Sequence, residues 1–277
     1  MSPKAKQRIK RFTPVQQLFH VLLMVSFLIQ SATGLARMYI ETTWGRQLAY
    51  LFGGYEAART IHIYVGILML VGFLIHIVYL LAKINLQRLS ADLSGPDSLM
   101  PRSVDIRHFF QHIGWFVGLQ KQPDFDRWGY WEKFDYWAVF WGMVVIGITG
   151  LMLAFPLATS RAFPGWTLNV AFWVHRIEAL LAIGHVFIIH FFVGHLRKIN
   201  FPMDRAMFEG SADFAHARHE RSAWIRRLEN SGLLEGMLTN ESATGQRVVS
   251  YVFGYIGLAA GIYLLVGALA NARLITW

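Results

Sequence analysis

The chain has 277 residues, of which 55% are hydrophobic, with 21 Phe, ten Trp and no cysteine. Five long apolar segments in such a composition indicate one integral membrane domain and exclude an ordinary soluble core. The absence of cysteine excludes disulfides, iron–sulfur clusters held by thiolates and covalent haem attachment through a C-x-x-C-H motif.

In chain order, the sequence predicts a polar tail, four membrane spans interrupted by a long loop, a polar connector and a fifth span. The tail (1–14) is basic and lacks the small-residue cleavage site of a signal peptide. Residues 15–200 form the predicted four-helix domain, with its long loop at 83–133. The connector is 201–247 and the last segment 248–277. The five predicted spans are 15–35, 61–82, 134–155, 168–196 and 248–270.

One piece of the long loop, 104–119, is aromatic and mixed with charge, and we expect it to lie on the membrane surface as an amphipathic helix. His108 and His112 share one face of this helix, but no third metal ligand is evident. His216 and His219 lie in the charged connector and are expected to be solvated.

The distribution of positive charge predicts the orientation in the membrane. Twenty Lys and Arg residues fall in 1–14, 83–133 and 197–247, whereas five fall in the segments on the opposite side. Positive residues favour the cytoplasmic side, so the N-terminus is predicted to be cytoplasmic and the C-terminus outside. The net charge of +9 is therefore a topology signal and does not indicate binding to nucleic acid.

Two of the spans carry pairs of histidines at nearly equal spacing. His62 and His76 lie 14 residues apart in the second span, and His175 and His190 lie 15 apart in the fourth. At about 100° and 1.5 Å per residue, the rotations within the pairs are roughly −40° and +60°, and the axial separations about 21–22 Å. Each pair therefore lies roughly on one face of its helix, at two matching depths.

Ionisable side chains within a span are energetically costly, and each marks a candidate functional site. Haem iron takes an imidazole on each side, so two helices with matching histidines are expected to clamp two noncovalent haems. In the predicted topology, His62 and His175 lie near the outer face, and His76 and His190 nearer the cytoplasm. His20 in the first span reaches a similar inner depth. The alternative is a set of polar residues hydrogen-bonded between helices.

Several other ionisable side chains in the spans have more than one interpretation. His195 would hold a third haem together with the histidine of the first span, whereas His185 is rotated away from His175 and is expected to pack. Glu178, one turn after His175, is a candidate proton relay or salt-bridge partner, and Arg59 a candidate partner of a haem propionate.

The span motifs, in their order, resemble the di-haem cytochrome b (gamma) subunits of respiratory formate dehydrogenases, thiosulfate reductases and nickel–iron hydrogenases. The first three spans carry this resemblance in RFTPVQQLFHVLLMVSFLIQSATGL, RTIHIYVGILML and WEKFDYWAVFWGMVVIGITGLML. It covers roughly residues 8–210 and implies a four-helix bundle that holds two b haems, to which this chain adds a fifth helix. The histidine spacing also resembles the cytochrome b core of quinol:cytochrome c oxidoreductases.

The two resemblances imply the same outer ligands, His62 and His175, and different ligands for the inner haem. The formate dehydrogenase-like pattern implies His20 with His190. In that family the two histidines of the fourth span are 14 residues apart, whereas His175 and His190 are 15 residues apart in this chain. The other pattern implies His76 with His190. We favour His76, because it lies on the same face of its helix as His62, and keep His20 as the alternative.

These features predict the membrane subunit of a respiratory oxidoreductase in the bacterial inner membrane, which transfers electrons between quinone and a partner subunit. The expected partner is a periplasmic multihaem cytochrome c or the iron–sulfur or catalytic subunit of the same complex. We expect quinone at the cytoplasmic side, beside the inner haem and walled by 104–119 and 201–208; a site near Glu178 is the rival. The alternative function is a haem-free membrane anchor or a proton-coupled transporter with a histidine relay.

Overall fold

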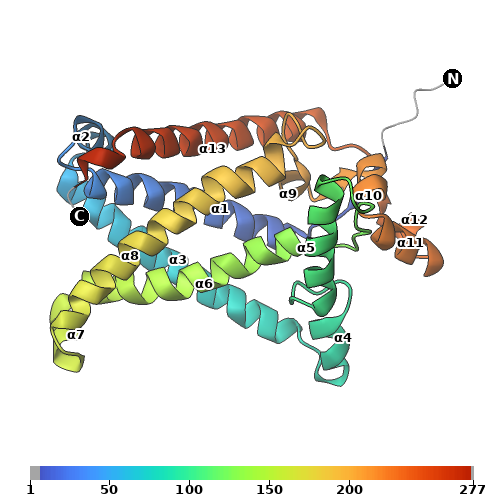
Figure 1. Cartoon of the computed structure of the whole chain (residues 1–277), viewed down its shortest axis with the longest axis horizontal. Helices are drawn as coiled ribbons and strands as arrows, with labels where there is room; N and C mark the ends of the chain where they lie inside the picture. The colour runs from blue at the N-terminus through green and yellow to red at the C-terminus, as the bar shows by residue number, and fades with distance from the viewer. Residues whose placement is uncertain (1–6, 276–277) are drawn as a thin grey trace. The chain divides into compact units, whose positions relative to one another are not determined.

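The computed structural model describes residues 7–275, and most of them are helical (Figure 1). Among them, five helices are long and apolar enough to cross a membrane. These are α1 (Pro14–Met38), α3 (Tyr55–Lys83), α6 (Tyr130–Ala154), the continuous helix Trp166–Leu196 and α13 (Thr244–Ala270). The predicted all-α integral membrane protein with five spans is confirmed. Residues 1–6 of the predicted tail and the last two of 248–277 lie outside the described residues.

The fourth span is built from three helical segments. It begins as the α-helix α8 (Trp166–Gly184) and continues as two π-helical segments, η2 (His185–His190) and η3 (Phe192–Leu196). The shorter elements that complete the fold are α2 (Thr43–Tyr50), η1 (Leu86–Arg88), α4 (Leu89–Ser94), α5 (Ser103–Phe116), α7 (Pro156–Ala162), α9 (Ala206–Glu209), α10 (Phe214–Glu220), α11 (Ser222–Asn230), α12 (Leu234–Met237) and η4 (Ala272–Leu274), with strands β1 (Arg8–Lys10), β2 (Ser211–Asp213) and β3 (Leu238–Thr239).

The chain divides into two compact units. One, here called the helix bundle, comprises residues 18–77, 141–204 and 248–275. The other, here called the polar unit, comprises 7–17, 78–140 and 205–247. The described part of the predicted tail, most of the long loop and most of the connector thus belong to one folded unit.

Side-chain contacts join four helices of the bundle into a closed ring. α1 meets α3, α3 meets α6, α6 meets α8, and the π-helical end of the fourth span returns to α1. The contacts in this order are Thr33–His62, Leu70–Gly147, Thr149–His175 and Phe187–Phe27. Because the ring is closed, side chains from four helices face a common interior.

The fifth helix, α13, packs on this ring through small residues. Its buried positions recur every three or four residues and are Ser250, Gly254, Gly257, Leu258, Gly261, Leu264 and Ala268. A Cβ at Gly261 would collide with the rings of Phe187 and Phe191, and one at Gly257 would touch Met24 and Leu28. Small residues at such spacing let helix backbones approach closely in membranes. α13 therefore packs against α1 and the end of the fourth span.

The polar unit contains a three-stranded antiparallel sheet in the order β2-β1-β3, in which Arg8 pairs with both Asp213 and Thr239. Ile9 of the central strand enters a small core with the buried Trp224, which is 1% exposed. The sequence analysis predicted no strands here. Strands of two or three residues are too short to show the alternation of apolar and polar residues that identifies a strand.

Buried charges hold the polar unit together. Arg11 and Arg221 both bind the carboxylate of Glu132. Lys133, only 2% exposed, forms an ion pair of 2.8 Å with Asp105 near the start of α5. Such pairs fix geometry, because removal of one partner leaves a buried charge uncompensated.

Candidate functional site

Two pairs of histidines face each other inside the helix bundle. The rings of His62 (α3) and His175 (α8) have centroids 6.2 Å apart, and those of His20 (α1) and His190 (η2) have centroids 6.5 Å apart. We call them the outer pair and the inner pair, after the predicted topology. Along α1, Thr33 at the outer pair lies 13 residues from His20, or about 20 Å. The pairs thus occupy two levels of one bundle.

The spacing within each pair matches two imidazoles on one metal ion. A metal–imidazole bond is about 2 Å long and the ring centre lies roughly 1 Å behind the nitrogen, so two opposed ligands have centres about 6 Å apart. The two rings of each pair come from different helices and approach each other inside the bundle. Each could therefore bind the two faces of one flat metal macrocycle, as haem requires.

Hydrogen bonds define which nitrogen of each outer histidine is free to bind metal. Nδ1 of His175 lies 3.2 Å from the carbonyl oxygen of Ile146, which accepts only, so Nδ1 carries the proton. Nδ1 of His62 lies 3.0 Å from the hydroxyl of Thr33, which gives its own proton to the carbonyl of Ile29, so this Nδ1 is the donor as well. In both rings the unprotonated nitrogen is then Nε2, the atom a metal needs.

The inner pair contains His20, whereas the sequence analysis favoured His76. The ring of His76 packs edge-on against Phe19 with centroids 4.8 Å apart, and Phe19 directly precedes His20. His76 therefore lies beside the inner pair, while His20 faces His190. The rotation argument correctly placed His76 on the side of α3 that carries His62, but it could not show which helix lies opposite the fourth span at the inner level.

The π-helical segment η2 accounts for the spacing of 15 between His175 and His190. A π-helix closes its turn at i→i+5, one residue more than an α-helix, and π-bulges are frequent at functional sites. One π turn absorbs the extra residue, so the net rotation becomes that of 14 α-helical residues, about −40° in place of +60°. His190 thereby stays on the face of the helix that carries His175.

The same π-helical geometry brings His195 next to His190, with ring centroids 6.2 Å apart. Five residues of α-helix would turn the two side chains about 140° apart, whereas residues at i and i+5 align in a π-helix. Neighbours on one helix cannot bind opposite faces of a macrocycle. His190 thus has both His20 and His195 as ring neighbours.

Comparison with known proteins decides the family. The model of the family described as prokaryotic cytochrome b561 matches residues 10–210. The chain belongs to the prokaryotic cytochrome b561 family. Relatives include the formate dehydrogenase cytochrome b556 subunit of Haemophilus influenzae, 24% identical over 236 residues, which are 85% of this chain and 90% of the relative. The formate dehydrogenase cytochrome b556(fdo) subunit of Escherichia coli K12 is 21% identical over 228 residues, 82% of this chain and 97% of the relative.

Membership in the cytochrome b561 family makes this chain a b-haem protein of the bacterial membrane that works as an electron-transfer subunit. The expected resemblance to formate dehydrogenase-type cytochrome b subunits is confirmed. The residues of the bundle fit a b haem, since it needs two opposed imidazoles and space between them. Gly34 and Gly150 leave room for the ligand rings themselves, because a Cβ there would lie 3.2 and 3.1 Å from Cε1 of His62 and His175.

Arg37 is a residue of the outer level that the sequence analysis did not single out. It lies in the last turn of α1, half-buried, and its charge acts on both His62 and His175. Its Nε is buried and has no hydrogen-bond partner among the described residues. A buried guanidinium nitrogen beside the outer pair suits an anionic group such as a haem propionate. In the sequence, Arg37 lies four residues, or about one helical turn, after Thr33, and this spacing could have placed it at the level of the outer pair.

The other candidates of the outer level are placed less favourably. Arg59, expected to meet a propionate, is exposed and forms an i,i+3 ion pair of 3.7 Å with Glu56. Glu178 is half-buried one turn after His175, and within residues 7–275 it forms a salt bridge with neither Arg176 nor Arg59. It thus remains a candidate for proton transfer only.

The histidines outside the bundle have structural roles. His112 is buried in an aromatic cluster of the polar unit, and its Nδ1 lies 3.0 Å from the hydroxyl of Tyr130. Burial, the first cause, and the charge of Arg107 lower the pKa of His108 below its usual value, so this ring is neutral. The described residues contain no cluster of three side chains that could hold a metal ion.

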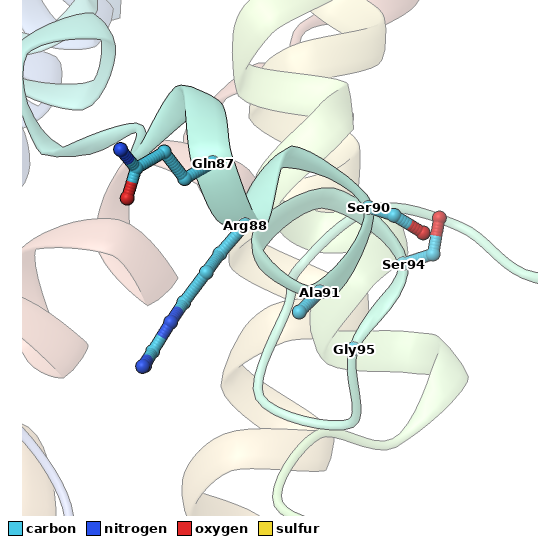
Figure 2. A pocket seen from close by; sticks show the side chains of 6 residues that line it. All are labelled: Gln87, Arg88, Ser90, Ala91, Ser94 and Gly95. Carbon is cyan, nitrogen blue, oxygen red and sulfur yellow. The ribbon is translucent and has the colours of Figure 1, made fainter.

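Figure 2 shows a hollow of the polar unit that is unrelated to the histidine pairs. It is open, and the residues that line it are Gln87, Arg88, Ser90, Ala91, Ser94 and Gly95 of η1, α4 and the following turn. The side chain of Arg88 extends away from those of Ser90 and Ser94. This open lining belongs to one short stretch of chain, so it does not provide the enclosed site that a haem or quinone ring needs.

Proposed function

We propose that this chain carries two b haems and transfers electrons across the bacterial membrane between quinone and a partner redox subunit. The observation that supports this most is the pair of opposed imidazoles at each of two levels in one four-helix ring. A separation of about 20 Å between the levels covers most of an apolar core about 30 Å thick. When bound, each haem iron accepts and releases one electron.

We assign the outer haem to His62 and His175 and the inner haem to His20 and His190. The outer assignment agrees with both resemblances. The inner one follows the facing rings of His20 and His190 and replaces the preference for His76. His20, His175, His62 and His190 then each supply one nitrogen, and the chain needs no other ligand type.

The chain is oriented with its N-terminus in the cytoplasm and its C-terminus outside. The support is the excess of Lys and Arg in the segments 1–14, 83–133 and 197–247. In this orientation the inner pair lies on the cytoplasmic side, and Arg37 and the outer pair lie near the periplasm. The outer haem then faces a periplasmic partner.

We place the quinone site beside the inner haem, where His76 is the leading candidate to bind a quinone carbonyl. His76 is half-buried and lies next to the inner pair through Phe19, and in our assignment it is not a haem ligand. An imidazole there can donate a hydrogen bond to a carbonyl and exchange a proton with it. Protons would be exchanged with the cytoplasm.

The partner is another subunit of an oxidoreductase. Two relatives are named as subunits of formate dehydrogenases. The chain is similar to each over most of its length, so we infer an analogous arrangement, in which an iron–sulfur or catalytic subunit, or a periplasmic multihaem cytochrome c, exchanges electrons with the outer haem.

The experiment that tests this function is a titration of the purified protein with a non-reducible quinone analogue, followed by the spectra of both haems. The analogue should change the spectrum of the inner haem, and His76→Ala should weaken its binding at least tenfold while both haems are retained. Glu178→Gln is the matched control at the outer level. If Glu178→Gln abolished the response and His76→Ala did not, the quinone site would lie on the outer side.

A further inference from the structure

The two outer histidines meet the same three-residue motif on two different helices. Thr33-Gly34-Leu35 of α1 faces His62, and Thr149-Gly150-Leu151 of α6 faces His175. In each case the threonine hydroxyl lies 3.0 or 3.2 Å from Nδ1, and the glycine has room for no side chain larger than hydrogen without close contact to the ring. Two unrelated helices thus hold two histidines in one way.

The direction of these hydrogen bonds follows from the other contacts of the hydroxyls. Thr33 donates its proton to the carbonyl of Ile29 at 2.7 Å, and Thr149 donates to the carbonyl of Val145 at 2.7 Å. Each hydroxyl has one proton and two lone pairs. Because the proton is used within the helix, the oxygen accepts from Nδ1–H of the histidine. Both threonines are buried, with 0% and 9% exposure.

At His175 the backbone adds a second acceptor at the same nitrogen. The carbonyl of Ile146, three residues before Thr149, lies 3.2 Å from Nδ1 of His175. Acceptors at Nδ1–H hold the ring orientation and increase the electron density at Nε2. Hydrogen bonds of this kind fix the tautomer of a metal-binding imidazole and raise its basicity.

We propose that Thr33 and Thr149 are positioning residues of the outer haem, which hold Nδ1–H of its two ligands and thereby lower its reduction potential. This rests on the proposed function, since it requires a haem between His62 and His175. A more basic imidazole favours the oxidised iron, which carries the higher charge. The threonines therefore act on the haem through the histidines and touch no reacting atom.

The test compares Thr33→Val and Thr149→Val, which keep the side-chain shape and lose the hydroxyl, with Thr33→Ser and Thr149→Ser, which keep the hydroxyl. Ser26→Ala is the matched control: Ser26 lies on α1 and donates to the Leu22 carbonyl at 2.7 Å, as Thr33 does to Ile29. The readouts are the midpoint potential and the electron paramagnetic resonance g-values of the outer haem, which is the one that His62→Ala removes.

Each valine variant should raise the potential of the outer haem alone. We expect each change to lower the preference for the oxidised state by about tenfold, which is the order of effect seen when a residue that holds a metal ligand is removed. A tenfold change in this preference raises the midpoint potential by about 59 mV for one electron. The serine variants should restore the potential, and Ser26→Ala should leave it unchanged. If the valine variants lose the outer haem altogether, its retention in both serine variants supports the same role.

Three results would overturn the proposal. These are unchanged potentials and g-values in both valine variants, an equal shift in Ser26→Ala, or loss of the outer haem in the serine variants as well. A wild-type protein without an outer haem would instead contradict the proposed function, so the two failures are distinguishable.

Discussion

Replacement of Gly150 by alanine should weaken the outer haem although it strengthens the helix that carries the change. The new Cβ would lie 3.1 Å from Cε1 and 3.5 Å from Nδ1 of His175. Carbon atoms prefer about 3.5–4.0 Å, so the ring has to move by roughly half an ångström. Metal–ligand distances tolerate only about 0.2 Å. The displacement therefore exceeds what the iron–nitrogen bond accepts.

The expected effect is a loss of roughly tenfold or more in the affinity for the outer haem, which is typical when the support of a metal ligand is disturbed. The helix itself should gain about 0.5–1 kcal/mol, because glycine within a helix is less favourable than alanine. The two effects have opposite signs, so general destabilisation cannot be mistaken for the specific one.

The assay is haem titration of the purified apoprotein, followed by its visible spectrum. Gly142→Ala is the matched control, since Gly142 lies on α6 as well and a Cβ there would meet nothing within 4 Å. It should gain the same helix stability and keep both haems. Equal haem affinity in Gly150→Ala and Gly142→Ala would refute the claim that Gly150 makes room for a ligand ring.

Two further predictions concern the polar unit and are measured by thermal unfolding, with tryptophan fluorescence, to which the buried Trp224 contributes, as the signal. Asp105→Asn should destabilise the unit by about 3–5 kcal/mol, because it leaves the ammonium of Lys133 buried without its partner. The double variant Asp105→Leu with Lys133→Met should be nearly neutral. Burial alone would raise the pKa of Asp97, but the hydrogen bonds and charge of Arg227 lower it below the ordinary 3.8. The stability from this pair should be complete above pH 3.8 and disappear as the pH falls through the lower pKa of the folded state, with a smaller acid effect in Arg227→Met.

The sequence was sufficient for the features that repeat along a single helix. Continuous apolar segments predicted the five spans, and the spacing of His62, His175 and His190 predicted two levels of candidate ligands. These follow from the rise and rotation of one helix and need no knowledge of its neighbours.

The features that depend on neighbouring helices could not be predicted in the same way. The choice between His20 and His76 depends on which helix faces the fourth span, and the rotation of a single helix does not contain that information. The π-helical segment His185–His190 has no sequence signature of its own. Its only indication in the sequence was the separation of 15 residues, in place of 14, between His175 and His190.

The polar unit shows a different limit. Its strands are too short for a periodic pattern, and its order comes from ion pairs between distant parts of the chain, such as that of Arg227 with Asp97 and Asp126. Charged residues in loops are usually solvated, so composition alone favoured a separate tail, loop and connector.

The measurement that tests the central claim most directly is the number of haems per chain in the purified protein and in single-histidine variants. The account predicts two b haems in the wild type and in His76→Ala, and one each in His62→Ala and His20→Ala. Two haems in His20→Ala and one in His76→Ala would contradict the inner assignment. A wild-type protein without a b-type spectrum would contradict the two-haem account as a whole and favour a haem-free membrane anchor or transporter.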